Sequence, residues 1–183
     1  MPDHSDAPEI RPATAAHLGA VAEIFAHYVT QTVITFTETP PTPDDWGRKL
    51  AELAERSLPF LVAEVNGQVA GFAYAGPWRA QPAYRHTAED SIYLSPDHTG
   101  RGLGRALLEA LLARCAEAGV RQLIAVIADA DNDASPALHR KFGFRDAGRL
   151  TAVGHKHGRW LDTLLLQRDL PSSGPNRPLR PIR

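Results

Sequence analysis

The segment HTGRGLGRALLEALL, residues 98–112, marks the place where a strand gives way to a helix. Its three glycines, Gly100, Gly102 and Gly104, stand at alternate positions, and no further glycine follows until Gly119. Leucines then recur at the spacing of one helical face. The N-terminus of a helix presents unpaired backbone N–H groups and the positive end of the helix dipole. The segment therefore predicts an anion site and favours a phosphate.

Patterns on both sides of this segment predict an α/β domain. In chain order they indicate a strand in 9–14, a helix after Thr14, a helix opened by Thr42, a hairpin over 59–78 turning at Asn66-Gly67, a strand over 91–94, the helix from Leu103, a strand over 121–128, a short helix over 135–143 and a strand over 160–170. An antiparallel meander followed by a strand–helix–strand crossover predicts one mixed, mostly antiparallel sheet with helices on both faces.

The domain is expected to span residues 9–170. The first eight residues carry no periodic pattern, and we expect them to be disordered. Residues 171–183 contain four prolines and three arginines but no acid, which predicts an unpacked tail.

Composition excludes several classes of protein. Twenty basic and 21 acidic residues give a net charge of −1, so no global charge favours nucleic acid or an anionic membrane as a partner. Cys115 is the only cysteine, which excludes an intramolecular disulfide and a CxxC metal or redox site. Neither a signal peptide nor an apolar run of membrane-spanning length is recognisable, so we expect a cytoplasmic protein without a metal.

Two familiar phosphate loops do not fit the glycine segment. A nucleotide P-loop ends in Gly-Lys-Ser/Thr, whereas Gly102 and Gly104 are followed by Leu103 and Arg105. A dinucleotide fingerprint that begins at Gly100 would need its third glycine at position 105, which is arginine. The phosphate therefore belongs to another kind of ligand.

A second motif, NDASPALHRKFGF at 132–144, follows about one helix and one strand later. With Gly102 and Gly104 it resembles the GNAT superfamily of N-acetyltransferases. The segments 61–104 and 154–170 are similar to the phosphinothricin and methionine sulfoximine N-acetyltransferases of that superfamily. The resemblance extends from Ile10 to Leu170. It implies the GNAT fold, acetyl-CoA as co-substrate and, as in those relatives, a homodimer.

The resemblance implies a cofactor site in which backbone N–H groups of 100–105 hold the pyrophosphate, while a strand edge and an asparagine side chain bind the pantetheine arm. Arg101 and Arg105 would add positive charge. Thr99 departs from the superfamily, which usually carries Gln or Arg there, so less side-chain chemistry is expected at the pyrophosphate. The expected cofactor residues are Tyr93, Leu94, Thr99, Gly100, Arg101, Gly102, Leu103, Gly104, Arg105, Asn132 and Ser135.

Two residues are candidates for proton transfer. Glu89 precedes the strand 91–94, where alternation places it on the opposite face from Asp90, and the resemblance places it at the general-base position. The alternative is that both are solvated acids at a loop–strand junction. His139 stands where most relatives carry a tyrosine that protonates the leaving thiolate. An imidazole with a pKa near 6.5 suits that role, although a structural histidine is the alternative.

Two basic loops point to an anionic acceptor. Residues 77–86 and 154–160 contain arginine, lysine and histidine but no acid, which suits an amino acid with carboxylate and phosphinate groups. An α-amine with a pKa of about 8 is roughly a tenth neutral at pH 7, so the base has a modest task. The expected acceptor residues are Phe36, Arg79, Tyr84, His86, Lys156 and Trp160.

The sequence thus predicts direct acetyl transfer to the α-amino group of a small anionic amino acid such as phosphinothricin, methionine sulfoximine or methionine sulfone. Two alternatives remain open. One is a GNAT enzyme for another small amine or a protein N-terminus, which an open groove would favour. The other is a non-catalytic acyl-CoA-binding module, for which Thr99 is the only indication.

Overall fold

A computed structural model describes residues 7–129 and 133–171. The prediction for Asn132, and most of the predictions for the two ends of the chain, fall outside these residues. The described part forms one seven-stranded sheet in the order β1-β2-β3-β4-β5-β7-β6. Every neighbouring pair is antiparallel except β4 and β5, which run parallel. The predicted mixed, mostly antiparallel sheet is therefore confirmed.

The strands are β1 Glu9–Pro12, β2 Phe60–Val65, β3 Gln68–Pro77, β4 Thr87–Leu94, β5 Gln122–Ala128, β6 Arg145–Lys156 and β7 Arg159–Asp169. The helices are α1 Leu18–Gln31, α2 Pro43–Glu55, α3 Leu103–Glu117 and α4 Ala134–Lys141. Short 3₁₀ turns at Ala15–His17, Pro82–Tyr84 and Pro96–His98 join them.

Local signals set several of these boundaries. Thr42 caps α2, because its Oγ1 accepts a hydrogen bond from the Asp45 N–H at 3.2 Å, and Pro43 occupies the first helical position. Asn66 and Gly67 both have positive φ, as the tight turn between β2 and β3 requires. Thr14 precedes a 3₁₀ turn rather than α1 itself, so the first helix begins four residues later than its cap signal.

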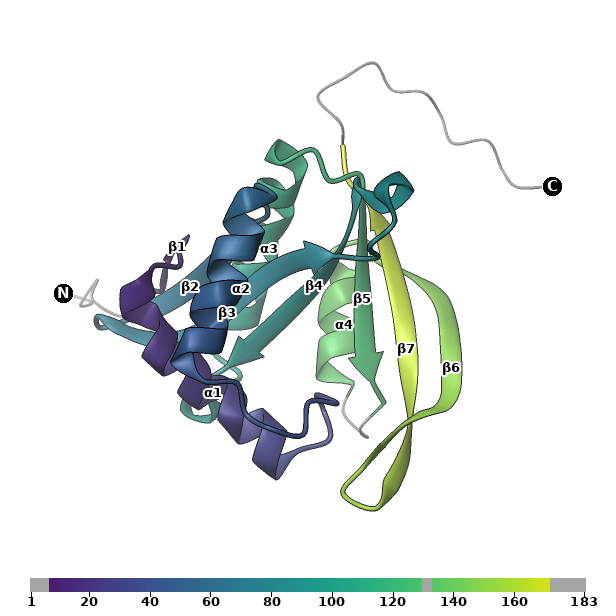
Figure 1. Cartoon of the computed structure of the whole chain (residues 1–183), viewed down its shortest axis with the longest axis horizontal. Helices are drawn as coiled ribbons and strands as arrows, with labels where there is room; N and C mark the ends of the chain where they lie inside the picture. Colours follow the sequence, from purple (N-terminus) through teal and green to yellow (C-terminus); the bar gives the residue numbers. More distant parts are fainter. Residues whose placement is uncertain (1–6, 130–132, 172–183) are drawn as a thin grey trace.

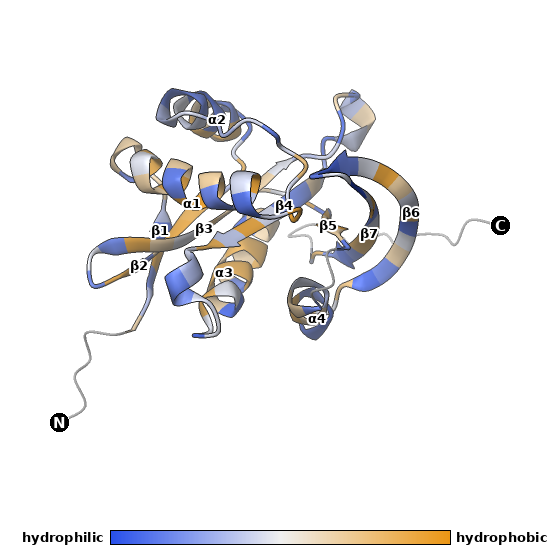
Figure 2. Cartoon of the chain, turned by 90° about the horizontal axis from the view of Figure 1, so that it is seen from below, coloured by the Kyte–Doolittle hydropathy of each residue, from blue (hydrophilic) through white to orange (hydrophobic). Residues whose placement is uncertain are grey.

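Helices cover both faces of the sheet, with a core on each side (Figures 1 and 2). On one face α1 and α2 pack an aromatic core that includes Trp46, Phe60 and Phe72. On the other face α3 buries the leucine stripe that its sequence predicts, together with Cys115. Burying apolar side chains against both faces is the main stabilising term for such a layered domain.

The parallel pair β4 and β5 separates partway along its length. Their paired residues run only from Thr87↔Gln122 to Asp90↔Ala125, although β4 continues to Leu94 and β5 to Ala128. Figure 1 shows the two strands spreading apart below this point. Beyond Asp90 the facing edges of the two strands are therefore not paired with each other. The divergence divides the sheet into a β1–β4 half and a β5-β7-β6 half.

Strand β6 is absent from the sequence prediction. It is the edge strand, pairs with β7 only, and is exposed along nearly all of its length. Its residues therefore lack the apolar alternation by which a half-buried strand is recognised. Two register irregularities, at Asp146/Gly148 and Leu150/Gly154, bend it further. Pairing with β7, rather than a pattern of its own, makes this segment a strand.

Candidate active site

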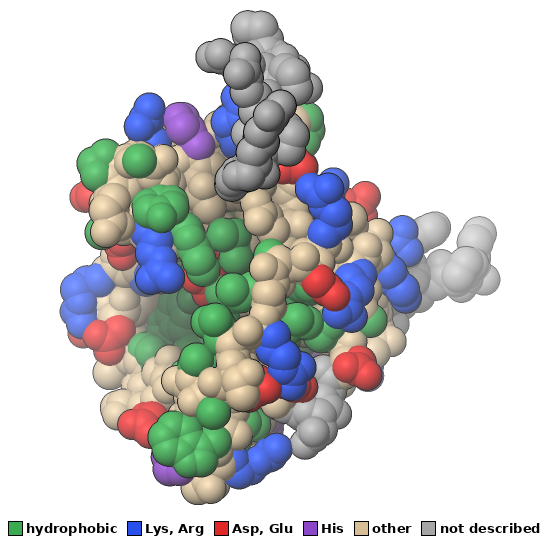
Figure 3. Space-filling model, turned by 90° about the vertical axis from the view of Figure 1, so that its right-hand side faces the viewer, with side chains coloured by type: hydrophobic (Ala, Val, Ile, Leu, Met, Phe, Trp, Pro, Cys, Tyr) green, Lys and Arg blue, Asp and Glu red, His purple; other side chains and the backbone are tan. Residues whose placement is uncertain are grey.

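A cavity of about 270 Å³ lies where β4 and β5 separate. It is lined by Ile34, Thr35, Phe36, Glu89, Asp90, Ser91, Ile92, Tyr93, Ala125, Val126, Ile127, Ala128, Ser135, His139 and Thr163. Seen from the side of β6 and β7, the surface is hollowed, with hydrophobic side chains inside the hollow and Lys and Arg side chains near its edge (Figure 3). A cavity that combines apolar walls with converging polar groups is the usual form of a small-molecule site.

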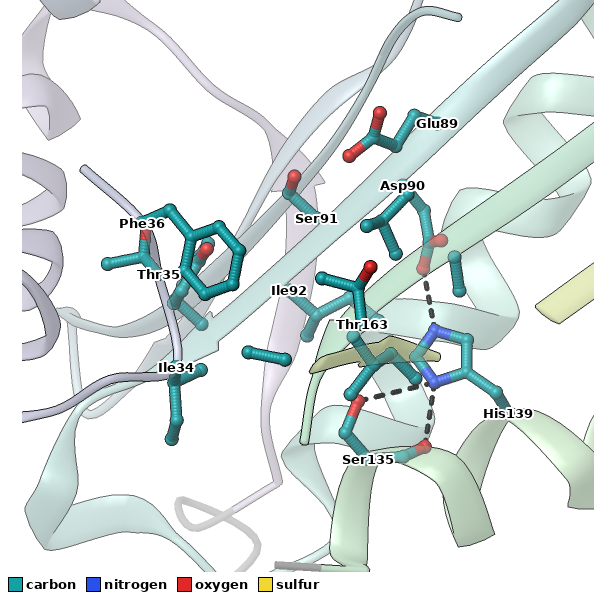
Figure 4. Close-up of a pocket in the computed structure, with 15 residues that line it drawn as sticks. Ile34, Thr35, Phe36, Glu89, Asp90, Ser91, Ile92, Ser135, His139 and Thr163 are labelled. Atoms are coloured by element: carbon teal, nitrogen blue, oxygen red, sulfur yellow. Dashed lines mark hydrogen bonds and ion pairs between the residues drawn. The ribbon is translucent and has the colours of Figure 1, made fainter. Parts of the chain in front are cut away.

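Alternation along β4 places its side chains on two faces of the cavity. Tyr93 packs with the aromatic core on the α1–α2 face, and Glu89 and Ser91 share its side of the strand. Asp90 is directed the other way and reaches His139 of α4 (Figure 4). The prediction that Glu89 and Asp90 point to opposite faces is therefore confirmed. The cavity connects the α1–α2 face with the α3–α4 face.

Glu89 is half-buried at the narrow end of the divergence, in the second-last pair of the β4–β5 ladder. Burial raises the pKa of its carboxyl, and the neighbouring charge of Asp90 raises it further. Lys49 of α2 and Arg79 oppose this rise, because their positive charges favour the carboxylate. A carboxylate with a raised pKa is a stronger base than an ordinary one, which suits it to accepting a proton.

Asp90 and His139 form a buried pair on the other face. His139 Nε2 lies 2.8 Å from Asp90 Oδ2, and Nδ1 lies 2.7 Å from the Ser135 carbonyl oxygen. Carboxylates and carbonyls only accept hydrogen bonds, so both ring nitrogens carry protons whenever Asp90 is ionised. Burial lowers the pKa of His139, but the hydrogen bond and charge of Asp90 and the Ser135 carbonyl outweigh it, and the pKa is raised.

Two polar atoms of the cavity wall have no hydrogen-bond partner among the described residues. They are Asp90 Oδ1 and Thr163 Oγ1, and both residues are at most 6% exposed. Leaving a buried polar atom unpaired costs free energy, so native structures usually supply a partner. These two atoms are therefore available to a polar group of a bound ligand.

The glycine segment leads into α3 as its sequence predicts. Gly100 and Gly102 adopt left-handed φ values of 74° and 81°, and Gly102 is the N-cap of the helix without any side-chain cap. The Thr99 hydroxyl donates a 3.2 Å hydrogen bond to the Pro96 carbonyl oxygen. Leu103 is buried, and Arg101 and Arg105 are exposed beside the turn. The amides of the first turn thus face outward without a capping side chain, as an anion site needs.

Replacing Gly102 by alanine is expected to weaken acetyl-CoA binding about tenfold, because a left-handed residue with a side chain costs about 1–2 kcal/mol and the turn shifts to relieve it. Gly67→Ala is the matched control. Gly67 also has a left-handed φ, of 74°, in the β2–β3 turn, and a Cβ there likewise meets no atom within 4 Å. Steady-state kinetics should show a raised KM for acetyl-CoA in the first variant only. An equal rise in both would reject the phosphate turn.

The remaining predicted cofactor residues lie on β4, α3 and α4. Tyr93 and Ser135 line the cavity. The Leu94 carbonyl accepts a 2.6 Å hydrogen bond from the Tyr28 hydroxyl, so this carbonyl already has a partner. Gly104 leaves room for close packing, since a Cβ there would lie 3.4 Å from a methyl of Leu138.

Of the six predicted acceptor residues, Phe36 lines the cavity and Arg79 acts on it through charge. Arg79 is exposed, and its guanidinium lies 4.8 Å from the centre of the Trp78 ring. Tyr84 is 45% exposed in the Pro82–Tyr84 turn and does not line the cavity. His86 is directed to the far end of β4, where Nδ1 lies 3.3 Å from the Gly119 carbonyl oxygen.

The basic loop 154–160 is not placed as its composition suggested. Trp160 is 70% exposed and packs against His155 at 4.8 Å between ring centres, outside the cavity lining. Lys156 is only 3% exposed, because its ammonium is turned inward and donates to the Thr35 carbonyl oxygen at 2.7 Å. The expectation that Lys156 contacts the acceptor directly is therefore corrected.

Several site residues escaped the sequence reasoning. The sequence pattern identifies Asp90 only as the neighbour of Glu89, and it indicates neither Thr163 nor Lys49. Asp90 and Thr163 share one signal, since each is a polar residue whose neighbours on the same face of its strand, two positions away, are apolar. Such a position favours a buried polar partner or a ligand. Lys49 carries no comparable signal, since it lies on the half-exposed side of a polar helix.

Within residues 7–129 and 133–171, no three His, Cys, Asp or Glu side chains come together in a way that would hold a metal ion. In the same part of the chain, no helix combines the length and apolar character needed to cross a membrane.

Known proteins of similar sequence and structure are acetyltransferases. Residues 21–144 match the Acetyltransferase (GNAT) family. A phosphinothricin N-acetyltransferase of Streptomyces viridochromogenes is 45% identical over 174 residues, covering 95% of this chain and 94% of that protein. An L-methionine sulfoximine/L-methionine sulfone acetyltransferase of Salmonella typhimurium is 38% identical over 164 residues, covering 88% and 94%. A solved GNAT superfamily phosphinothricin acetyltransferase from Sinorhizobium meliloti, in complex with acetyl-CoA, has a TM-score of 0.86 at 42% identity and covers 94% of this chain and 93% of its own.

The chain belongs to the GNAT family of acetyltransferases. It is an N-acetyltransferase, and GNAT enzymes use acetyl-CoA as their co-substrate. The family resemblance inferred from the glycine segment and residues 132–144 is thereby confirmed.

Proposed function

We propose that this enzyme transfers the acetyl group of acetyl-CoA directly to the α-amino group of a small anionic amino acid such as phosphinothricin, methionine sulfoximine or methionine sulfone. The observation that carries the proposal is the cavity at the β4–β5 divergence, which is lined by Glu89, a carboxyl on which the positive charges of Lys49 and Arg79 act. The names of the relatives from Streptomyces, Salmonella and Sinorhizobium support this class of acceptor.

In this proposal acetyl-CoA binds from the α3–α4 face. The turn at Gly100 and Gly102 would hold the pyrophosphate on backbone N–H groups, with the charges of Arg101 and Arg105 nearby. The pantetheine amides would pair with the β4 edge after Asp90, which is not taken up by β5. The solved Sinorhizobium relative was found in complex with acetyl-CoA, which supports this ligand.

The acceptor would occupy the α1–α2 face of the cavity. Lys49 and Arg79 are close enough to act on the charge of Glu89, so they also attract the carboxylate and phosphinate of an incoming amino acid. Phe36 and Ile34 supply an apolar wall. A polyamine would meet repulsion from the same two cations, which disfavours it as an acceptor.

Glu89 would act as the general base, directly or through one water molecule. It takes the proton from the ammonium group, and the neutral nitrogen attacks the thioester carbonyl carbon. The C–N bond forms while the C–S bond breaks, the sulfur leaves as a thiolate, and the nitrogen loses its second proton to water as the neutral amide forms. The raised pKa of Glu89 supports this role, because a base is most effective when its pKa approaches the working pH.

His139 would return a proton to the departing thiolate. The raised pKa of His139 keeps its imidazolium form populated to higher pH than in a free histidine, so the imidazolium would supply a proton beside the cavity. Both ring N–H groups already donate, to Asp90 and to Ser135, so donation to sulfur requires the imidazole to turn away from one partner. In this proposal His139 can protonate the thiolate only when its ring rotates away from Asp90 or Ser135.

A thiol-release assay with acetyl-CoA and a panel of acceptors tests the proposed substrate class. We expect turnover with phosphinothricin, methionine sulfoximine and methionine sulfone, and little with spermidine, because Lys49 and Arg79 repel polyamines. Glutamate and a short peptide complete the panel. Turnover confined to the peptide would instead indicate a protein N-terminal acetyltransferase. Acetyl-CoA binding without turnover on any acceptor would indicate a non-catalytic module.

A further inference from the structure

The segment between α1 and α2, residues 32–42, forms the wall of the cavity on the acceptor side. Ile34, Thr35 and Phe36 line the cavity opposite Asp90, His139 and Ser135 (Figure 4). Ile34 and Phe36 are 38% and 39% exposed, whereas Thr35 between them is only 8% exposed. Thr35 is therefore the point at which this exposed segment is held to the rest of the protein.

Lys156, at the end of β6, holds the backbone of that point. Its Nζ donates a 2.7 Å hydrogen bond to the Thr35 carbonyl oxygen, across 121 residues of sequence. The lysine is almost fully buried. Burial lowers its pKa, and the negative charge of Glu38, from the same 32–42 segment, opposes this and attracts the ammonium group. A charged donor makes a stronger hydrogen bond than a neutral one, so this contact is a firm one.

Gly154, two residues earlier on β6, makes room for the neighbouring side chain. A Cβ at position 154 would lie 2.3 Å from Cε2 of Phe36, far inside contact distance. Gly154 does not have a positive φ, so its glycine is required for space and not for backbone conformation. The Phe36 ring thus rests directly on the backbone of β6. Any larger residue at position 154 would push it away.

These two contacts join the halves of the sheet that the β4–β5 divergence separates. The 32–42 segment follows α1, which packs on the β1–β4 half, and its Thr35 lines the cavity together with Tyr93 of β4. Strand β6 belongs to the β5-β7-β6 half. Lys156 and Gly154 therefore bridge the mouth of the cavity and set where its acceptor-side wall stands.

We infer that Lys156 and Gly154 are positioning residues for the acceptor: they fasten the 32–42 segment across the cavity mouth and place Phe36 against the bound amino acid. This inference rests on the proposed function for the identity of the acceptor. The contacts of Lys156 with Thr35 and of Gly154 with Phe36 do not depend on which acceptor binds. Neither residue contacts the reacting atoms, so each acts through Thr35 or Phe36.

Lys156→Met tests the fastening. The variant should fold, because methionine keeps the volume of the lysine stem and leaves one neutral carbonyl without its donor, a smaller loss than that of an unpaired buried charge. We expect the KM for phosphinothricin to rise about tenfold or more, from the loss of a charge-assisted hydrogen bond. The kcat and the KM for acetyl-CoA should stay unchanged. Backbone amides of 32–42 should exchange hydrogen faster in the free enzyme. Lys141→Met, at an exposed lysine of α4, is the control.

Gly154→Ala and Phe36→Ala provide a double-mutant cycle for the second contact. Each single change should raise the KM for the acceptor. In the Phe36→Ala background, Gly154→Ala should add nothing further, because the added Cβ then has no ring to displace. Additive effects of the two changes would show that Gly154 does not act through Phe36 and would overturn that part of the inference.

The outcomes separate this inference from the proposed function. Unchanged amide exchange in Lys156→Met would overturn the fastening, whatever the enzyme acetylates. Faster exchange with an unchanged KM for phosphinothricin would show a fastened segment that does not position the acceptor, which also overturns the inference. No turnover of phosphinothricin by the unaltered enzyme would overturn the proposed substrate class, while the exchange measurement would still decide the fastening.

Discussion

Glu89→Gln is expected to lower kcat for phosphinothricin by about two to four orders of magnitude, the usual contribution of a positioned general base. The amide has nearly the shape of the carboxylate but cannot take the ammonium proton. The KM for acetyl-CoA should stay nearly unchanged, because Glu89 lies on the acceptor face of β4 and away from the turn at Gly102. Steady-state kinetics of both substrates measure this split.

The pH dependence of this loss distinguishes a base from a structural residue. Glu89 is ionised only above its raised pKa, whereas the amine becomes neutral by itself above a pH of about 8. The deficit of Glu89→Gln should therefore be largest between these two values and shrink at higher pH. Glu55→Gln, an exposed glutamate of α2, is the control and should behave like the unaltered enzyme. A deficit of constant size at every pH would remove Glu89 as the base.

His139→Leu is expected to destabilise the enzyme by about 3–5 kcal/mol at neutral pH, because it leaves the Asp90 carboxylate buried without its partner. Asp90 Oδ1 already lacks a hydrogen-bond partner among the described residues, so the carboxylate would lose its main compensation. Equilibrium unfolding in urea measures the change. Arg140→Leu is the control, since it removes an exposed ion pair with Asp146 and should cost less than about 1 kcal/mol.

A double variant, Asp90→Val with His139→Leu, should recover much of this loss, because replacing both members of a buried pair by apolar residues is often neutral. The pKa of folded His139 is raised above its unfolded value of about 6.5. The stability that this raised pKa contributes is therefore fully present below pH 6.5, and it is lost as the pH rises through the folded value. The difference in free energy of unfolding between the unaltered enzyme and the double variant should therefore decrease as the pH rises. A double variant as unstable as His139→Leu would contradict this account of the pair.

Local features of the fold could be predicted from the sequence because their signals are local. The start of α2 follows from the cap at Thr42, and the β2–β3 turn follows from Asn66 and Gly67. The turn at Gly102 and the leucine stripe of α3 are likewise properties of one segment. Strand β6 could not be predicted, since it is exposed and becomes a strand by pairing with β7.

Features of the site that depend on one segment could likewise be predicted, whereas those that join distant segments could not. The face on which Glu89 lies could be predicted, because alternation in a single strand decides it. The pairing of Asp90 with His139 joins residues 49 apart, and the contact of Lys156 with Thr35 joins residues 121 apart. Only the folded arrangement brings such residues together. A basic loop such as 154–160 thus predicts a positive surface, although folding turned Lys156 inward.

The proposed reaction transfers an acetyl group to the α-amine of an anionic amino acid in the cavity at the β4–β5 divergence. The most direct test is mass spectrometry of phosphinothricin after incubation with acetyl-CoA and the purified enzyme, with the released thiol counted in the same samples. We predict a product heavier by one acetyl group on the amine, with one thiol released for each product molecule. Recovery of unmodified phosphinothricin, whether or not thiol is released, would contradict the proposed reaction.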